Sequence, residues 1–429
     1  MELRFEAARA RPALADEDID RAIDARSELI GPVLAGPARD AGMLGWLAVG
    51  EAMPEPALAA LRDEAARARE LADTLVLVGI GGSNRGALAA IGALGRRVAS
   101  PARVVCAGDS LSASALREVL ATARRESVVL DVVAKDFNTL EPGIAFRLLR
   151  EAMIERHGEA CGERILVTGS RGAGQLLELA RAQGYRSLEF PASIGGRFSV
   201  LSAVGLFPMA FAGLDVGALL EGARDAERAL RHASRDSLRE NPAVRYAVAR
   251  NLLAARGFVV EGLAAFEPDL APFGRWWTQL FAETDGKCGE AVFPTFLAYS
   301  EDLHAVGQFV QQGRRCLFET FLGLFHEASE LAINPSGKVR DGFEYLDGKP
   351  FDLLNRTVRE AALEAHSAGG VPCLELSCGE LREESLGALF YFFMLSAYLS
   401  ASLLGVNPFT QDGVEGYKRS MYRRLGKTR

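Results

Sequence analysis

The sequence predicts an α/β protein in which parallel sheets are flanked by helices. Short apolar runs alternate along the chain with amphipathic stretches, and this β-α-β-α rhythm is typical of a parallel sheet. One run, Leu75 to Val78, has the composition of a strand buried on both faces and leads through glycines into a helix-spaced segment. One core rarely accommodates a chain of 429 residues, 49% of them hydrophobic, so we expect two domains.

The predicted elements follow in chain order. Residues 1 to about 65 are rich in Ala, Arg and Glu and predict helices. A long helical region is expected from Val200 to Arg256, and a less regular set of strands beyond it indicates a second α/β unit. The expected strands are Leu75–Val78, Arg103–Ala107, Val128–Val133, Ile165–Thr168 and Leu188–Phe190, followed by Phe258–Leu263 and Cys373–Ser377.

Composition and charge argue against several classes of protein. The net charge of −7 and the isoelectric point near 5.5 argue against a general nucleic-acid binder. The six cysteines have no CxxC spacing, which favours reduced thiols over a disulfide framework or a zinc site. The first twenty residues contain no apolar signal-peptide core, so we expect a cytoplasmic protein. None of the residue spacings suggests a metal site, and we expect no metal or other cofactor.

The stretch from Gly387 to Val406 is long enough to cross a bilayer, because it contains twenty residues without a charge. It also contains three serines and two tyrosines, and no second such span accompanies it. We therefore expect a helix buried in a large core or in a subunit interface. The apolar stretch from Phe198 to Leu214, interrupted by Pro208, has the same interpretation.

The glycine turn after Leu75–Val78 predicts an anion site. Gly79, Gly81 and Gly82 remove side-chain bulk, so that backbone N–H groups ahead of the next helix can approach a ligand. Ser83 is expected at or near the start of that helix, where a hydroxyl and free amides suit a phosphate ester. The turn matches neither the dinucleotide-binding glycine pattern nor a P-loop, and a tight connection without a ligand is the alternative.

Four further segments carry candidate chemical groups. Arg197 follows two glycines, and Glu283 follows an aromatic helix. His304 lies among mixed polar and apolar neighbours, and Lys418 lies near the start of the last helix. Each residue also has an ordinary structural interpretation: surface ion pairs for the two cations, a helix cap for the glutamate and a core position for the histidine.

Taken together, these segments resemble the glucose-6-phosphate isomerase family of the short bacterial type. The resemblance extends from about residue 40 to the C-terminus and is carried, in the family's order, by VGIGGSNRGALAAIGAL, IGGRFSVLSAVGLFP, QLFAETDGKCGEAVFP, SEDLHAVGQFVQQGRR and LGVNPFTQDGVEGYK. It implies two sugar-isomerase (SIS) domains, each with a parallel five-stranded sheet flanked by helices. The expected division is an N-terminal helical segment (1–65), a first SIS domain (66–205) and a second with the C-terminal helix (206–429).

The resemblance also implies an aldose–ketose isomerase whose homodimer shares its active sites. Glu283 matches the base that moves a proton between C1 and C2, and Arg197 matches the cation that stabilises the enediolate. His304, expected from the neighbouring subunit, and Lys418 match the pair that opens the sugar ring. Residues expected to line the sugar and phosphate are Gly82, Ser83, Lys135, Asp136, Thr139, Gln279 and Gln411.

One segment departs from the family pattern, and it is the loop expected to bind the phosphate. Where relatives have a serine- and threonine-rich loop, this chain has Ala134, Lys135 and Asp136, and the carboxylate would repel a dianion. The glycine turn also has Asn84 and Arg85 where relatives have other residues. Either Arg85 neutralises Asp136 and the phosphate is bound weakly, or the pocket accepts another C6 group.

Two other functions are therefore weighed against glucose 6-phosphate isomerisation. One is isomerisation of a hexose with a sulfonate, amino or uncharged group at C6. The other is a non-catalytic sugar-phosphate sensor, which the retained proton-transfer residues argue against, because a sensor needs no base.

Overall fold

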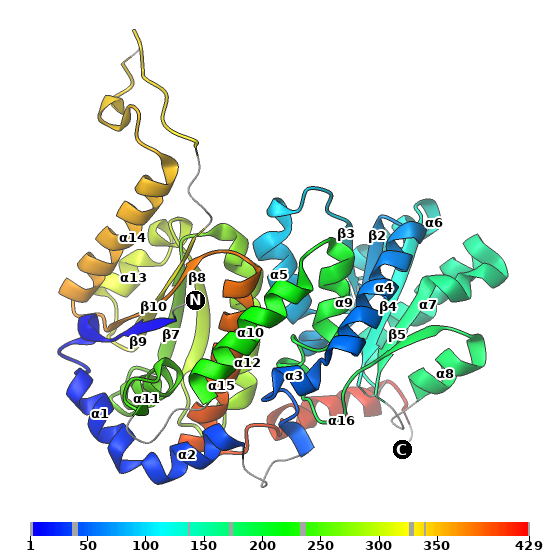
Figure 1. Cartoon of the computed structure of the whole chain (residues 1–429), viewed down its shortest axis with the longest axis horizontal. Helices are drawn as coiled ribbons and strands as arrows, with labels where there is room; N and C mark the ends of the chain where they lie inside the picture. Colours follow the sequence, from blue (N-terminus) through cyan, green and yellow to red (C-terminus); the bar gives the residue numbers. More distant parts are fainter. Residues whose placement is uncertain are drawn as a thin grey trace.

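The computed structural model describes residues 3–36, 42–135, 138–170, 175–231, 237–325, 330–338 and 340–427. Among these residues the strands form two five-stranded sheets, which lie at opposite ends of the molecule with helices between and around them (Figure 1). The α/β prediction is therefore confirmed. The division of the chain into domains stays a prediction; position 65 lies within helix α4 (Glu55–Leu71) and position 205 within helix α9 (Ala203–Ala212).

The first sheet is wholly parallel, with the strand order β3-β2-β4-β5-β6. Its strands are β2 (Thr74–Val78), β3 (Arg103–Ala107), β4 (Val128–Ala134), β5 (Ile165–Gly169) and β6 (Arg186–Glu189). All five were expected, although β6 begins two residues before the predicted start. The helices that follow the first four strands are α5 (Arg85–Leu94), α6 (Ala113–Arg125), α7 (Leu140–His157) and α8 (Gln175–Gln183).

Both faces of this sheet are buried, as the continuous apolar strands predict. Val76 and Val78 belong to the core cluster that contains side chains of α6 and α7. The alternate residues Leu75 and Leu77 face the other side, where α4, α5 and α9 supply the packing. The sheet is thus held rigidly from two sides, and its carboxyl edge is a fixed platform for loops.

The second sheet has the order β1-β10-β9-β7-β8, and its edge strand β1 is antiparallel to the others. Its strands are β1 (Arg4–Glu6), β7 (Val260–Ala265), β8 (Phe293–Ala298), β9 (Leu317–Phe325) and β10 (Cys373–Glu380). Sequence analysis missed β1, β8 and β9. Pro294 weakens the strand signal of β8 and is tolerated because β8 is an edge strand, while Glu319 and Gly323 interrupt the apolar run of β9.

The two sheets share the order of four of their strands. Read from the edge strand β8, the second sheet runs β8-β7-β9-β10-β1, and its first four strands match β3-β2-β4-β5 of the first sheet. The fifth position differs, because β1 comes from the start of the chain and is antiparallel, whereas β6 follows β5 and is parallel. In a sheet of this order, the second strand lies on one side of the first strand and the third strand lies on the other side. The chain therefore changes its winding direction at the boundary between the first and third strands, which are β2 and β4 in the first sheet. The glycine turn after β2 and the loop after β4 therefore emerge side by side at the carboxyl edge.

The remaining helices join the two sheets and extend the chain ends. The helical region expected at 200–256 is divided into three helices, α9, α10 and α11. Their bounds, and those of the others, are α1 (Asp16–Ala25), α2 (Ser27–Ala35), α3 (Val49–Ala52), α10 (Val216–Arg231), α11 (Pro242–Ala255), α12 (Ala271–Thr284), α13 (Gly307–Gln312), α14 (Phe351–Ala368), α15 (Glu383–Leu403) and α16 (Glu415–Arg424).

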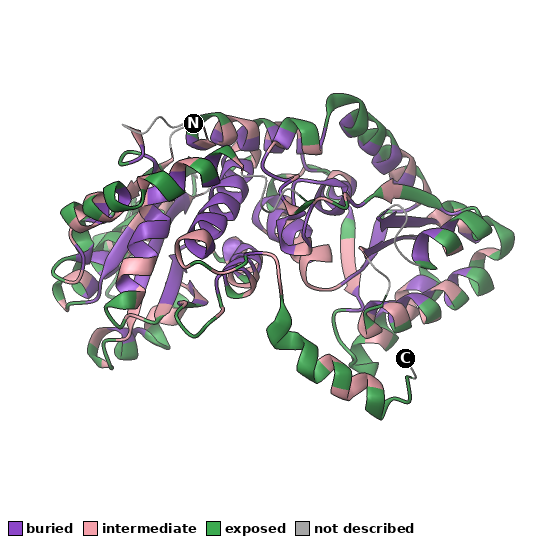
Figure 2. Cartoon of the chain, turned by 90° about the horizontal axis from the view of Figure 1, so that it is seen from below, coloured by how far each residue is buried: buried purple, intermediate pink, exposed green. Residues whose placement is uncertain are grey.

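Helix α15 is the centre of the packing between the sheets. It is the one helix in the described residues with the length and composition of a membrane span, and nearly all of its apolar stretch is buried inside the protein. It contacts α10 closely, because Gly222 and Gly387 leave no room for a side chain: a Cβ on Gly387 would lie 1.8 Å from the Leu219 carbonyl oxygen. The buried central helices contrast with α16, which ends near the C-terminus and is largely exposed (Figure 2). The prediction of a buried helix is confirmed.

A second close approach joins the glycine turn to the turn that carries Arg197. Gly82 lies against Gly196, and a Cβ on Gly82 would be 2.2 Å from the carbonyl carbon of Gly196 and 2.7 Å from the Arg197 nitrogen. The two backbones can touch here because Gly82 has no side chain, whereas a Cβ on Gly196 would meet only the Gly82 Cα, at 3.9 Å.

We expect Gly82→Ala to lower the thermal unfolding midpoint, because the added methyl forces the two turns apart at a cost of roughly 1–3 kcal/mol. Gly95→Ala is the matched control, since a Cβ there meets nothing within 4 Å. Differential scanning calorimetry measures both variants. Equal midpoints for Gly82→Ala and Gly95→Ala would show that the two turns are not in contact.

Asp131 is a buried carboxyl group in the middle of β4. Thr168 on β5 donates a hydrogen bond of 2.9 Å to one of its oxygens. Burial raises the pKa of Asp131 to about 7, with the Thr168 hydrogen bond opposing the shift. The folded chain therefore keeps this proton to a higher pH than the unfolded chain does.

The raised pKa determines how the stability of the folded chain depends on pH. The unfolded carboxyl ionises near pH 4 and the folded one near pH 7, so its contribution to stability is complete below pH 4 and is lost as the pH rises to 7. We expect Asp131→Asn, which cannot ionise, to lose less stability than the wild type between pH 5 and pH 8. Urea-unfolding midpoints at the two pH values test this, with the exposed Asp63→Asn as control; parallel profiles for wild type and Asp131→Asn would contradict it.

Candidate active site

Helix α12 presents Gln279 and Glu283 toward the glycine turn. The other side of the helix is fixed in the core by Trp276 and Trp277; the Trp276 ring lies 4.7 Å from the ring of Phe390 on α15. Residues four positions apart share one helix face. Accordingly, Gln279 Nε2 donates a hydrogen bond of 3.1 Å to Glu283 Oε1.

Arg197 reaches α12 from the turn that precedes α9. The neighbouring Phe198 anchors this turn by stacking on Trp46, with 4.8 Å between ring centroids. The guanidinium is buried, with 5% of the side chain exposed, and it donates to Thr284 Oγ1 at 3.0 Å and to Glu283 Oε2 at 3.1 Å. Burial lowers the pKa of Arg197 and the Glu283 carboxylate opposes that shift, so the guanidinium stays charged at neutral pH.

Glu283 is the point at which three segments of the chain meet. Besides Gln279 and Arg197, its carboxylate accepts a hydrogen bond of 2.5 Å from Gln411 Nε2, which lies in the loop before α16. The side chain is still 34% exposed. A carboxylate that is fixed in position and open to solvent on one side can exchange a proton with a small molecule beside it.

A cavity of about 720 Å³ opens beside this carboxylate. It lies between the glycine turn, the first turns of α5 and the outer face of α12. Its volume is within the range of small-molecule sites. Among its lining residues are Gly81, Arg85, Asp109, Arg275, Gln279 and Glu283.

Some residues of the glycine turn are open to a ligand, and others only shape the turn. Gly81 has a φ of +61°, and Ser83 is partly exposed just before α5, as the prediction of an anion turn requires. Asn84 is buried and donates a hydrogen bond of 3.1 Å to the Gly79 carbonyl, so it shapes the turn. Arg85 lines the cavity and makes no hydrogen bond or ion pair with another described residue.

The loop after β4 is only partly described. Lys135 Nζ donates to the carbonyls of Ala192 and Ile194 at 2.8 and 2.9 Å, and burial lowers the pKa of this lysine. Its ammonium therefore fastens the segment that leads to Arg197.

Ala134 and Thr139 lie on either side of this loop. Ala134 is the buried last residue of β4, and Thr139 is exposed at the start of α7. Asp136 lies outside the described residues, so both alternatives, its pairing with Arg85 and a pocket for another C6 group, stay predictions.

His304 and Lys418 are not brought to Glu283 within the described part of this chain. His304 is exposed in a short 3-10 turn after β8, and its side chain makes no hydrogen bond to the part of the chain that the structure describes. Lys418 on α16 forms an ion pair of 2.9 Å with Glu415, and the hydrogen bond to Glu415 raises the pKa of Lys418. Helix α16 lies near the loop after β4, since the Tyr422 hydroxyl donates to the Asn138 carbonyl.

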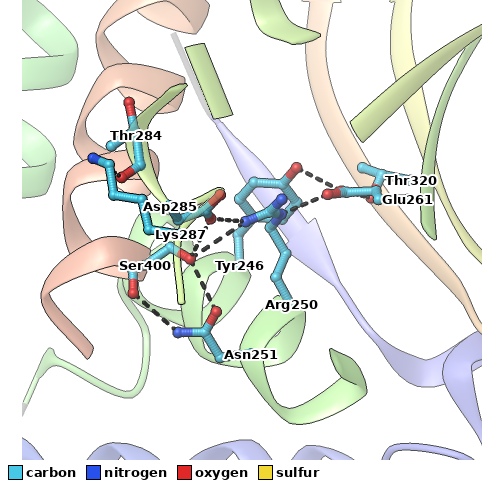
Figure 3. A network of polar contacts seen from close by, with 9 residues as sticks. All are labelled: Tyr246, Arg250, Asn251, Glu261, Thr284, Asp285, Lys287, Thr320 and Ser400. Atoms are coloured by element: carbon cyan, nitrogen blue, oxygen red, sulfur yellow. Dashed lines mark hydrogen bonds and ion pairs between the residues drawn. The ribbon is translucent and has the colours of Figure 1, made fainter. Parts of the chain in front are cut away.

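A buried charge network supports the end of α12, and sequence analysis missed it (Figure 3). Arg250 on α11 is fully buried and forms ion pairs of 2.5 Å with Glu261 and 2.7 Å with Asp285, the residue that follows α12. Burial alone would lower the pKa of Arg250, but the two carboxylates raise it above its usual value. Arg250 gave no distinct sequence signal, because the same helical segment also contains Arg245 and Asn251.

The hydrogen bonds to Glu261 and Asp285 complete this network. Tyr246 and Thr320 donate to Glu261 at 2.6 and 2.7 Å, and Ser400 on α15 donates to Asp285 at 2.8 Å. The turn after α12 is thereby tied to α11, α15 and the second sheet.

Comparison with known sequences assigns a family. The model of the family described as phosphoglucose isomerase matches residues 64–425. The chain is 42% identical over 396 residues to a glucose-6-phosphate isomerase of Symbiobacterium thermophilum, covering 90% of this chain and 88% of that one. It is 39% identical to the glucose-6-phosphate isomerase of Staphylococcus aureus strain NCTC 8325, covering 91% and 89%.

Solved structures have the same architecture. A hypothetical protein of Thermus thermophilus superposes with a TM-score of 0.88 and 27% identity, covering 99% of this chain and 100% of that one. A glucose-6-phosphate isomerase of Chlamydia trachomatis, 21% identical, shares the fold with a TM-score of 0.80 and coverage of 99% and 88%. With the family model matched over most of its length and relatives well above 30% identity, the chain belongs to the phosphoglucose isomerase family, a family of aldose–ketose isomerases.

Proposed function

We propose that this protein interconverts glucose 6-phosphate and fructose 6-phosphate in the cytoplasm, with Glu283 as the base. The observation that carries the proposal is the position of the Glu283 carboxylate, half-buried beside the cavity and oriented by Arg197, Gln279 and Gln411. Its relatives at 36–42% identity are glucose-6-phosphate isomerases, which favours phosphate as the C6 group. The free thiols of all six cysteines fit the proposed compartment.

The arrangement suits proton transfer through a cis-enediolate. Glu283 removes a proton from C2 of the open-chain aldose and returns it to C1, while the C1 carbonyl oxygen gains a proton and the C2 hydroxyl loses one. The intermediate carries negative charge on oxygen. Arg197 supplies a buried, permanently charged group next to the base, so its attraction for that charge is strong.

Ring opening is assigned to His304 and Lys418, which move a proton between the ring oxygen and the C1 hydroxyl. We propose that His304 is delivered by a second copy of the chain. This is supported by its exposed position and by the partners of Glu283 among the described residues of the same chain, which do not include His304.

The segment between β9 and α14 supports a homodimer. Its described residues, 330–338 and 340–350, extend away from the body of the molecule (Figure 1). They expose the apolar side chains of Leu331, Phe343 and Tyr345, each more than half accessible. Apolar side chains on a projecting segment are stabilised when another protein surface covers them.

Replacement of the base tests the proposal directly. We expect Glu283→Gln to lower kcat by roughly 10²- to 10⁴-fold while glucose 6-phosphate still binds, because the amide keeps the shape but is a negligible base. A coupled isomerase assay measures turnover, and exchange of the C2 proton with deuterated solvent measures proton abstraction.

The exposed Glu364→Gln on α14 serves as the control for loss of a surface carboxylate. Exchange at the wild-type rate in Glu283→Gln would exclude Glu283 as the base. Absence of glucose 6-phosphate turnover in the wild type would exclude the proposed substrate.

Complementation between two inactive variants tests which subunit supplies His304 to each site. We expect His304→Ala and Glu283→Gln homodimers to be nearly inactive when purified separately. A mixed dimer contains one site with both residues intact if His304 crosses between subunits. The purified mixed dimer should then reach up to about half of the wild-type activity, and an unseparated co-expressed mixture, in which about half of the dimers are mixed, up to about a quarter. If His304 serves its own chain, every site in the mixed dimer lacks one group, and no activity returns.

A further inference from the structure

Two cations hold consecutive carbonyl groups of the loop that carries Gln411. Lys287 Nζ donates a hydrogen bond of 2.5 Å to the Asn407 carbonyl oxygen, and Arg197 donates to the carbonyl oxygen of Pro408. The second bond of Lys287, 2.9 Å long, goes to the Thr284 carbonyl at the end of α12. Lys287 thus connects the end of the helix that bears Glu283 to the loop that touches Glu283.

The same loop is fixed further along by an aromatic contact. The Asn407 side chain accepts a hydrogen bond of 2.8 Å from the Phe409 N–H, and the Phe409 ring packs 5.7 Å from Phe198 and 5.9 Å from Tyr398. Two residues beyond Phe409, Gln411 reaches the Glu283 carboxylate. The position of Gln411 is therefore determined by a short stretch whose first residue is held by Lys287.

We propose that Lys287 is a positioning residue for the base, holding the 407–411 loop against α12 so that Gln411 orients the Glu283 carboxylate. The role rests on the proposed isomerase function of Glu283. It differs from an ordinary structural lysine because both of its partners lie within the two segments that form the Glu283 cluster. A cation at the C-terminal end of α12 is also favoured by the helix dipole.

The charges around Lys287 make its protonation sensitive to pH. Burial and the nearby Arg197 lower the pKa of Lys287 to about 8, against the attraction of Asp285, Asp412 and Glu283. Above that pH the amine loses its charge, and a neutral donor binds carbonyl oxygens more weakly than an ammonium does. The contact with Asn407 should therefore weaken as the pH rises through 8.

The test compares Lys287→Met, which keeps the aliphatic length without the donor, with Lys287→Arg, which keeps a permanent cation. Arg69→Met is the matched control, because Arg69 also joins two backbone carbonyls, those of Phe211 and Ser100, at a site remote from Glu283. We expect Lys287→Met to lower kcat about tenfold or more, with KM changed less than threefold. Lys287→Arg should recover a large part of kcat, and Arg69→Met should lower the unfolding midpoint alone.

Two further measurements separate positioning from a general loss of stability. Hydrogen exchange of the peptide that spans 405–412 should be faster in Lys287→Met than in the wild type, while exchange in β2 and β4 is unchanged. The wild-type kcat should also decline with a midpoint near pH 8, and this decline should be absent in Lys287→Arg.

Failure of the positioning role and failure of the proposed function give different results. An inactive wild type with glucose 6-phosphate would overturn the function, and the exchange experiment would still report on the loop. An active wild type with unchanged kcat in Lys287→Met, or with identical pH profiles for wild type and Lys287→Arg, would overturn the positioning role. If Lys287→Met does not fold, the comparison of pH profiles decides alone.

Discussion

The buried guanidinium of Arg197 is the interaction on which the candidate site depends. It comes from a turn packed on the first sheet, and its hydrogen bonds reach α12 at Glu283 and Thr284 and the C-terminal loop at Pro408. A charge removed from water is stable only when its partners are in place, and loss of one partner leaves a costly unpaired group. The site is therefore assembled as a unit, with the first sheet, α12 and the C-terminal loop each supplying a part.

A second, buried charge network supports this unit. The network of Arg250, Glu261 and Asp285 is buried where the turn after α12 meets α11 and α15, and it contains one more carboxylate than guanidinium. Such a network specifies geometry more than it adds stability, because the cost of desolvation offsets much of the ionic attraction. Here the geometry it specifies is that of the residues directly after Glu283.

Elements and residues with a local signal could be predicted from the sequence, and those that depend on distant contacts could not. The strands of the first sheet were predicted because each is a continuous apolar run, whereas β8 and β9 contain polar or strand-weakening residues and β1 forms only through its distant partner β10. The cluster of Arg197, Gln279, Glu283 and Gln411 was expected from resemblance, and the structure brings these four together. Lys287 lay within one of the matching segments, but nothing in its neighbours indicated that it would contact a carbonyl 120 residues away. His304 and Lys418 stay predictions, since their expected partners are not contacted within the described residues of one chain.

The pairing of β1 with β10 ties the beginning of the chain to its far end. Arg4 pairs with Ser377, so β1 has no partner in the sheet until β10 has been synthesised. The last helix makes the opposite connection, because Tyr422 of α16 contacts Asn138 beside the first sheet. Each terminus is thus attached to the sheet built from the other half of the chain. Neither half could be excised as an autonomous module with its own sheet and covering helix complete, and evolution by exchange of single halves is correspondingly constrained.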